Sequence, residues 1–419
     1  MSMLSLVDPE MAALLDKEAA RQNCTLEMIA SENFVPPAIL EAQGSILTNK
    51  YAEGYPGNRY HGGCEFIDGI EALAIERAKS LFGADHANVQ PHSGVNANLG
   101  VYQAVLQPHD TILSMDLRHG GHLSHGAKAS ITGRFFNIVH YGVHPQTERI
   151  DMDQVETLAL EHRPKLIVAG GSAYPRVIDF ARFREIADKV GALFMVDMAH
   201  IAGLVAAKVH PSPVPFADFV TSTTTKTLRG ARGGFILCRK EYAQKIDKAI
   251  FPGTQGGPIL QNVMAKGVTF RIAGTAEFAR MQAQVVKNAS TLAGTLSAAG
   301  YRIVSGGTDN HLMLVDMRPR GMTGVFAEET LAKIGIMVNK NLIPFDTAPA
   351  TVTSGIRIGA AAVTTRGLRE DDMKQVGALM DRAMTNASDE RLLEGLREEV
   401  RQICLHRPLY LHFGEGALL

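Results

Sequence analysis

The residues best suited to covalent chemistry lie in the segment Thr221–Gly234 (TSTTTKTLRGARGG). Lys226 stands there between a hydroxyl-rich run and a turn rich in glycine and arginine. Strand-like apolar runs flank the segment, at Phe216–Thr221 and Phe235–Cys238. A lysine amine in a confined site can form a Schiff base once its pKa is lowered, and small hydroxyls beside it can hold an anion. A surface turn rich in threonine is the alternative interpretation for this segment alone.

A carboxylate, Asp197, ends the preceding apolar run LFMVD, and His200 follows three residues later. Such a carboxylate is either a helix N-cap or a buried partner for a protonated ring nitrogen, as pyridoxal phosphate enzymes require. Asp197 and Lys226 follow consecutive predicted strands. Because ligands of open parallel sheets sit at the carboxyl ends of strands, both side chains can reach one small molecule.

Ser93 and Gly94 lead straight into a helical pattern. A helix start aims backbone N–H groups and a positive dipole end at an anion, for which phosphate is the natural candidate. An ordinary capped helix start is the alternative. A lysine for an aldehyde, a carboxylate for a pyridinium and a helix start for a phosphate together make one coherent cofactor site.

The elements that must position these residues alternate along the chain. Several short apolar runs are continuous, as strands covered on both faces are. The predicted strands are Ala87–Val89, Thr111–Met115, Phe136–Val139, Leu166–Ala169, Leu193–Val196, Phe219–Thr221 and Phe235–Cys238. The helical patterns between them include Ile67–Phe82, Met152–Glu161 and Phe180–Val190. This alternation predicts an α/β fold with a mostly parallel seven-stranded sheet wrapped by helices.

The C-terminal part of the chain has a different pattern. Two long helices are predicted at Ile259–Met281 and Gln284–Ala299. After them, predicted strands at Arg302–Val304, Leu312–Val315, Ile336–Val338 and Ile356–Ile358 alternate with helices at Ala327–Lys333, Asp371–Met384 and Glu390–Cys404. We therefore expect an N-terminal arm with helices (1–60), a large cofactor-binding domain (61–282) and a smaller α+β domain (283–419), since 419 residues exceed one ordinary core.

Composition excludes several classes of protein. A net charge of -1 gives no support for a nucleic-acid or anionic-membrane partner. The four cysteines form no CxxC pair, which suits reduced thiols in a cytosol and argues against a disulfide scaffold. Acidic residues at Asp8 and Glu10 argue against a signal peptide, and no run of 18 apolar residues could span a membrane. A soluble cytoplasmic protein is expected.

Several long motifs resemble serine hydroxymethyltransferase, in order from about Asp8 to Met384. They are ASENF, NKYAEGYPGNRY, QPHSG, HGGHLSHG, DMAHIAGL, KTLRGARGG, FPGTQGGP, NKNLIPFD and TSGIRIG. The resemblance implies a fold-type I pyridoxal phosphate transferase, with tetrahydrofolate as the one-carbon co-substrate. It also implies a homodimer or homotetramer whose active sites are completed across the subunit interface.

The resemblance assigns roles to individual residues. Lys226 would hold pyridoxal 5'-phosphate as a Schiff base, Asp197 would pair with the pyridine nitrogen, and His122 would stack on the ring. His200 and Ser172 would lie near the phenolic oxygen. The phosphate would be held by Ser93 and Gly94, helped by Gly256, Gly257 and the neighbouring subunit's copy of Tyr51.

The substrate and folate sites follow in the same way. Arg357 would clamp the substrate carboxylate bidentately, with Ser31, Tyr51 and His61 in the substrate region. Glu53 would transfer the proton linked to folate and the hydroxymethyl group. The predicted pterin contacts are Leu117, Gly121, Leu123 and Asn341. For Arg357 the alternative is a strand-end salt bridge. The alternative interpretation of His119, His122 and His125 is a metal site, although no acidic second-shell pattern accompanies them.

This sequence also departs from the family pattern. Thr225 replaces a histidine beside the cofactor lysine, and His61 replaces the second of two tyrosines. Thr351 stands where an aromatic residue beside the folate is common. Thr225 and His61 are both expected near the substrate Cα, where their change leaves room for an extra methyl group. We therefore predict α-methylserine as substrate, with D-alanine as product and formaldehyde transferred to tetrahydrofolate.

Three alternatives stay open. An ordinary serine hydroxymethyltransferase, which converts serine to glycine, would share nearly every motif. A folate-independent 2-methylserine aldolase would keep Lys226, Asp197 and Arg357 without using Glu53 and Asn341 for folate. The last alternative is a non-catalytic relative that binds pyridoxal phosphate or RNA.

Overall fold

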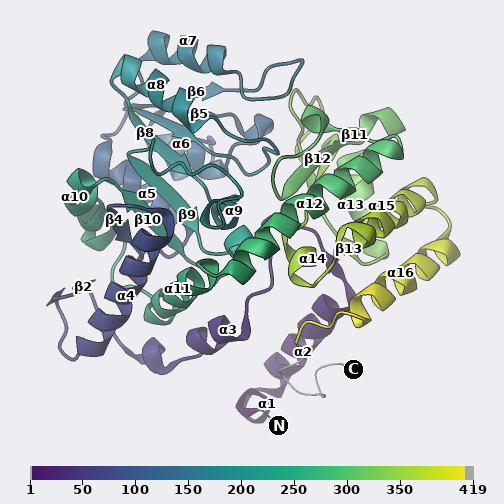
Figure 1. Ribbon diagram of the computed structural model, residues 1–419, viewed down its shortest axis with the longest axis horizontal. Coiled ribbons are helices and arrows are strands. Elements are labelled where there is room, and N and C mark those ends of the chain that lie inside the picture. The colour runs from purple at the N-terminus through teal and green to yellow at the C-terminus, as the bar shows by residue number, and fades with distance from the viewer. Residues whose placement is uncertain (1, 411–419) are drawn as a thin grey trace.

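A seven-stranded sheet forms the centre of the larger of two α/β units (Figure 1). The structure, a computed structural model, describes residues 2–410. The strand order is β4-β10-β9-β8-β7-β5-β6. The strands are β4 (His86–Asn88), β5 (Thr111–Met115), β6 (Asn137–Tyr141), β7 (Leu166–Ala169), β8 (Leu193–Asp197), β9 (Phe219–Thr223) and β10 (Gly234–Cys238). β10 runs antiparallel to both of its neighbours, and the other pairings are parallel. The predicted mostly parallel sheet is therefore confirmed.

Both faces of this sheet are covered, which explains the continuous apolar runs. In β7, Ile167 and Ala169 pack into one core, whereas Leu166 and Val168 pack into the core on the opposite face. The first core is closed by α4 (Glu65–Phe82), α7 (Met152–His162), α8 (Phe180–Val190), α9 (Ala202–Ala206) and α11 (Leu260–Ala273). The second is closed by α5 (Gly94–Val105) and α10 (Ala243–Lys248). Every side chain of such a strand leaves water, so apolar residues are favoured at each position.

The smaller unit contains an antiparallel sheet of order β11-β12-β15-β14. Its strands are β11 (Arg302–Ile303), β12 (Leu312–Asp316), β14 (Asn339–Asn341) and β15 (Gly355–Gly359). Its helices are α13 (Gly324–Lys333), α14 (Ala361–Thr365), α15 (Glu370–Thr385) and α16 (Glu390–Leu405). The predicted smaller α+β domain accordingly has its own sheet and its own core.

The predicted strand Ile336–Val338 does not join that sheet. It forms β13 (Ile336–Met337), which pairs in parallel with β1 (Leu26–Glu27) in a separate two-stranded sheet. The N-terminal arm therefore contacts the C-terminal unit through β1. Its remaining elements are α1 (Met3–Val7), α2 (Pro9–Cys24), α3 (Pro37–Gln43) and the hairpin β2 (Gly54–Tyr55) with β3 (Asn58–Arg59).

The two long helices predicted at Ile259–Met281 and Gln284–Ala299 have a different boundary. The chain forms α11, breaks at Gly274 and Thr275, and continues as α12 (Ala276–Ala298). Thr275 caps α12, because its hydroxyl accepts a hydrogen bond from the Phe278 N–H at 3.2 Å. The predicted domain boundary at 282/283 thus falls inside a helix, and Figure 1 shows α12 running from one unit to the other.

Helix α12 contacts both units. The Gln282 amide donates to the Thr227 carbonyl at 2.8 Å, and the Asn288 amide donates to the Leu368 carbonyl at 2.8 Å. Within residues 2–410, no helix has the length and apolar character needed to cross a membrane.

Candidate active site

Lys226 begins a short 3-10 helix directly after β9 and has a positive φ of 56°. The turn is fixed by backbone hydrogen bonds: Thr224 N–H donates to the Gly233 carbonyl at 3.0 Å, and Gly230 N–H donates to the Thr224 carbonyl at 2.7 Å. Burial, opposed by Asp197 and assisted by the Arg357 charge, lowers the pKa of Lys226 to about 8. A lysine with this pKa is partly a neutral amine near neutral pH, as a nucleophile must be.

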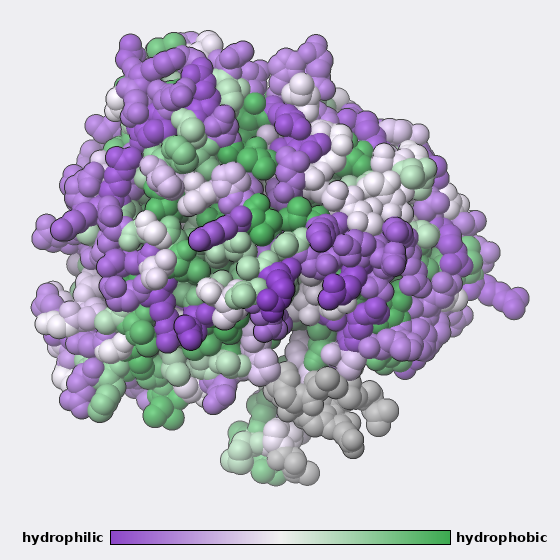
Figure 2. Space-filling view, in the orientation of Figure 1, coloured by the Kyte–Doolittle hydropathy of each residue, from purple (hydrophilic) through white to green (hydrophobic). Residues whose placement is uncertain are grey.

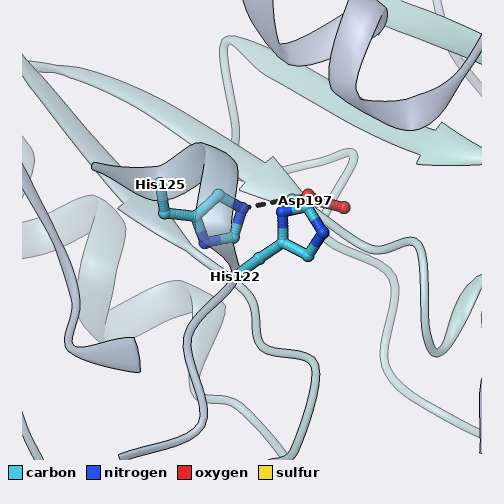
Figure 3. Close-up of side chains that lie close together, drawn as sticks. All are labelled: His122, His125 and Asp197. Carbon is cyan, nitrogen blue, oxygen red and sulfur yellow. Dashed lines mark hydrogen bonds and ion pairs between the residues drawn. The ribbon is translucent and has the colours of Figure 1, made fainter. Parts of the chain in front are cut away.

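Asp197 ends β8 and faces the same space. Its Oδ2 accepts a hydrogen bond from His125 Nε2 at 2.9 Å (Figure 3). The same oxygen accepts a second hydrogen bond from Asn98 Nδ2, also at 2.9 Å. Burial alone would raise the pKa of this carboxyl, but the hydrogen bond from His125 and the nearby imidazoles outweigh it and hold the pKa well below its ordinary value. Asp197 does not cap α9, whose N-cap is Ile201. It is a buried carboxylate, as a partner for a protonated ring nitrogen must be.

The two partners of this carboxylate, His125 and Asn98, were not predicted from the sequence. Asn98 lies in α5, donates also to Ser124 Oγ at 2.9 Å, and accepts from Thr221 Oγ1 at 2.6 Å. His125 belongs to the quoted motif HGGHLSHG, but its contact spans 72 residues and no local spacing reveals it.

The predicted metal alternative does not form as stated. His119 turns away from the other two histidines: its Nδ1 accepts from Val143 N–H at 3.0 Å and its ring lies 4.7 Å from that of Phe345. His122, His125 and Asp197 do present possible ligand atoms within 4.8 Å of one another. His125 and Asp197, however, are hydrogen-bonded to each other.

His122 presents a neutral imidazole. Its Nδ1 accepts a hydrogen bond from Ser124 N–H at 3.1 Å, and burial lowers its pKa to about 4. Figure 3 shows its ring beside Asp197. A neutral ring in this orientation suits stacking on a flat heterocycle.

Ser93 is the N-cap of α5, so the predicted helix start is confirmed. Its Oγ accepts from Asn96 N–H at 3.3 Å, and Gly94 packs against Thr223 of β9. The first N–H groups of α5 have no intrahelical acceptors, and the first residues of this helix, Gly94 and Val95, line the same pocket as Lys226.

One pocket brings most of these predicted residues together. The predicted residues that line it are Ser93, Gly94, His122, Ser172, Asp197, His200, Thr225 and Lys226. His125, Thr223 and Arg232 line it as well and were not predicted. A lysine amine, a buried carboxylate, a neutral imidazole and an open helix start are the groups that an aldehyde, a pyridinium, a flat ring and a phosphate require. The residues present therefore fit pyridoxal phosphate.

Arg357 lies on β15, at the border of the two units. Its Nη1 donates to the Ser172 carbonyl at 2.7 Å and its Nε donates to Asn339 Oδ1 at 3.1 Å. Burial lowers its pKa to about 10, so it stays charged at neutral pH. Within residues 2–410 it forms no ion pair, so the alternative of a strand-end salt bridge is wrong.

Two further predicted contacts lie near Arg357. Gly359 of β15 packs closely on Ala30, which precedes Ser31. His200 Nδ1 lies 3.2 Å from His311 Nε2, and burial holds the pKa of both imidazoles below the ordinary value. Among the residues that line the pocket, His122 and His200 are thus neutral imidazoles, and Arg232 contributes a guanidinium.

The other predicted substrate residues form a separate cluster. The Tyr51 and His61 rings are 5.8 Å apart. A Cβ atom at Gly257 would lie 3.5 Å from both Glu53 Cγ and the Tyr51 ring, and one at Gly256 would lie 3.5 Å from Glu53 Oε1. Glu53 and Gly256 line a shallow depression that shares no lining residue with the Lys226 pocket. Within one chain, the predicted site is therefore divided in two.

The predicted folate contacts lie in the turns after β5 and at the end of β14. Leu117 and Leu123 are exposed on the turns that flank Gly121, which packs against the Met115 carbonyl. Asn341 ends β14, and its amide donates to the Leu342 carbonyl at 2.6 Å. β14 pairs with the strand that carries Arg357, so Asn341 belongs to the second unit.

Comparison with known proteins agrees with this geometry. The family model described as serine hydroxymethyltransferase matches residues 4–380. A protein of Coprothermobacter proteolyticus named "Serine hydroxymethyltransferase" is 61% identical over 403 residues, which cover 96% of this chain and 97% of the relative.

Proposed function

The chain belongs to the serine hydroxymethyltransferase family, and on this premise we propose that it transfers the hydroxymethyl group of L-serine to tetrahydrofolate, leaving glycine. Enzymes of this family use pyridoxal phosphate, with tetrahydrofolate as the one-carbon acceptor. The observation that carries the proposal is the convergence of Lys226, Asp197 and Ser93 on one pocket.

Each residue has a separate task in this proposal. Pyridoxal phosphate supplies the electron sink that lets a bond at the substrate Cα break. Lys226 holds the cofactor, Asp197 holds a proton on its ring nitrogen, and the start of α5 binds its phosphate. Arg357 binds the substrate carboxylate and so decides which Cα bond stands perpendicular to the ring.

Proton transfer to and from the hydroxymethyl group falls to Glu53 in this proposal. His122 and the neutral His200 both line the pocket, where His122 would stack on the cofactor ring. Leu117, Gly121, Leu123 and Asn341 are the proposed pterin contacts. None of these groups except Glu53 needs to change its charge during turnover.

A second candidate substrate is α-methyl-L-serine, which would give D-alanine. Thr225 favours it: this small side chain lines the pocket beside Lys226, and its Oγ1 lies 3.0 Å from Thr223 Oγ1. A histidine there would occupy more of the space beside Cα. The relative named as a serine hydroxymethyltransferase favours serine instead.

The two substrates are distinguished by supplying purified protein with L-serine or α-methyl-L-serine, with and without tetrahydrofolate, and measuring the amino-acid products. We expect folate-dependent glycine formation. If D-alanine forms from α-methyl-L-serine faster than glycine forms from L-serine, α-methylserine is the substrate. Equal turnover with and without tetrahydrofolate would indicate an aldolase.

The Thr225→His variant tests the role of Thr225. If this residue admits a methyl group, the variant loses α-methylserine turnover relative to serine turnover by about tenfold or more. Thr225→Ser is the matched control, because it keeps the hydroxyl and the small volume. An unchanged ratio of turnovers in Thr225→His would remove Thr225 as the selector.

A homodimer or homotetramer is part of the proposal. The projecting helices α1 and α2 expose Met3, Leu6, Val7, Leu14 and Leu15, and Figure 2 shows green apolar side chains on this projection at the bottom of the molecule. Apolar surface of this extent favours burial against another chain.

The proposed compartment is the cytoplasm, where the four free cysteines would stay reduced.

A further inference from the structure

A second lysine, Lys266, lies beneath the pocket without lining it. It belongs to α11 and is 1% exposed. Its Nζ donates to the carbonyls of Val89 at 2.6 Å, Pro91 at 2.9 Å and Gly234 at 2.9 Å. A buried ammonium is costly unless its donors are satisfied, and here the three N–H groups meet three backbone acceptors.

These carbonyls come from two segments that build the site. Val89 and Pro91 lie in the loop between β4 and Ser93, whereas Gly234 is the first residue of β10. Gly234 N–H also donates to the Pro91 carbonyl at 2.9 Å.

The loop before α5 and the start of β10 are packed too closely to admit a side chain at Gly233 or Gly234. A Cβ atom at Gly234 would lie 2.1 Å from the Ser93 carbonyl oxygen, and one at Gly233 would lie 2.3 Å from Lys266 Cε. Gly233 in turn accepts from Thr224 N–H, two residues before Lys226. The Lys266 ammonium therefore joins the loop that precedes α5 to the turn that carries Lys226.

We propose that Lys266 is a positioning residue for the phosphate group of the cofactor, because its ammonium fixes the start of α5 relative to Lys226. The inference rests on the proposed placement of the phosphate at Ser93. The charged form makes all three contacts: a neutral amine has one donor fewer, so one of the three carbonyls would lose its hydrogen bond from Nζ.

The titratable groups that face Lys266 are Glu71 from α4 and His92 from the loop. Glu71 is itself held by Arg59 and Gln90. Burial lowers the pKa of Lys266 to about 7, against the attraction of Glu71. Burial also lowers the pKa of His92, so this imidazole stays neutral above pH 7. A bound phosphate dianion favours the ammonium, so phosphate affinity falls as pH rises above 7.

The test uses pyridoxine 5'-phosphate, which lacks the aldehyde and binds without reacting with Lys226. Binding to the cofactor-free protein is followed by fluorescence, with pyridoxine as the probe that lacks phosphate. In Lys266→Met we expect the Kd of pyridoxine 5'-phosphate to rise about tenfold or more, and that of pyridoxine to stay within about twofold.

Arg366→Met is the matched control. Arg366 is another buried cation that donates to backbone carbonyls, those of Gln22, Asn23, Thr25 and Arg407, but it lies in the C-terminal unit. Its loss should leave both affinities unchanged, which separates a local effect on the phosphate loop from general loss of stability.

A second measurement needs no change at Lys266. In Lys226→Ala, which removes the other titrating amine, the affinity for pyridoxine 5'-phosphate should fall between pH 7 and 9. A constant affinity there, or unchanged binding in Lys266→Met, would overturn the role of Lys266. If the unsubstituted protein fails to bind pyridoxine 5'-phosphate, the placement of the phosphate at Ser93 is overturned as well.

Discussion

His125 Nε2 donates a hydrogen bond of 2.9 Å to Asp197 Oδ2, and this contact joins the turn after β5 to the end of β8. Asp197 is acceptor-only when ionised, so the imidazole must carry its proton on Nε2. The contact keeps the carboxylate both charged and oriented toward the pocket. A buried carboxylate without such a partner would favour its protonated form.

The first prediction concerns this hydrogen bond. In His125→Ala, the pKa of Asp197 should rise and its hold on the ring nitrogen should weaken, so kcat should fall about tenfold or more. The measurement is steady-state serine cleavage, together with the absorbance of the bound cofactor. Asn98→Ala removes the other donor to the same oxygen and serves as comparison. Unchanged kcat and absorbance in His125→Ala would contradict the assigned role.

The second prediction is a pH dependence of cofactor capture. The amine of Lys226 must be neutral to attack the aldehyde, and burial lowers its pKa to about 8. The rate at which cofactor-free protein takes up pyridoxal phosphate should therefore rise with pH, with its midpoint near pH 8. Stopped-flow absorbance between pH 6.5 and 9.5 measures it. A midpoint near the ordinary lysine value of 10.5 would show that burial does not lower the pKa of this amine.

Much of the large sheet could be predicted from the sequence, because each inner strand is buried on both faces. Leu166–Ala169 and Thr111–Met115 are apolar runs whose ends coincide with observed strands. The break at Gly274 and Thr275 was missed, because apolar residues continue across it and only the C-cap glycine of α11 and the threonine cap of α12 mark it. The partner of Ile336–Met337 was missed because β1 has only two residues, too few for a pattern.

Some residues of the candidate site could likewise be predicted from the sequence, and others could not. Lys226, Asp197 and Ser93 follow strand ends, which the fold class brings to one edge, so their convergence could be expected. His125 acts through a contact 72 residues away in sequence, and Lys266 through contacts 32, 175 and 177 residues away, so their partners follow only from the tertiary packing. The separation of Tyr51 and Glu53 from Lys226 within one chain is likewise a property of the fold alone.

The third prediction concerns Arg357. Its guanidinium is fixed by Ser172 and Asn339 and forms no ion pair within residues 2–410, so it is available to a carboxylate. Arg357→Lys keeps a charge but loses the planar fork, and KM for serine should rise about a hundredfold. Asn339→Ala, which removes only a supporting acceptor, should have a smaller effect. Equal KM values in Arg357→Lys and the unsubstituted enzyme would exclude Arg357 as the carboxylate site.

The fourth prediction follows from the division of the site. Tyr51, Glu53 and His61 lie together but apart from the Lys226 pocket of the same chain. Tyr51 is 68% exposed, although the resemblance assigns it to the cofactor phosphate. If both assignments hold, the cluster completes the pocket of a second copy.

Mixed dimers test this arrangement directly. Lys226→Ala and Glu53→Gln should each be inactive alone, since each lesion then affects both sites. When the two variants are unfolded and refolded together, a shared site predicts that each mixed dimer has one doubly damaged and one intact site. Random pairing then restores about a quarter of the normal activity. If Glu53 instead serves the Lys226 of its own chain, every site carries one lesion and no activity returns. The controls are each variant refolded alone, and gel filtration that establishes equal dimer content in all samples.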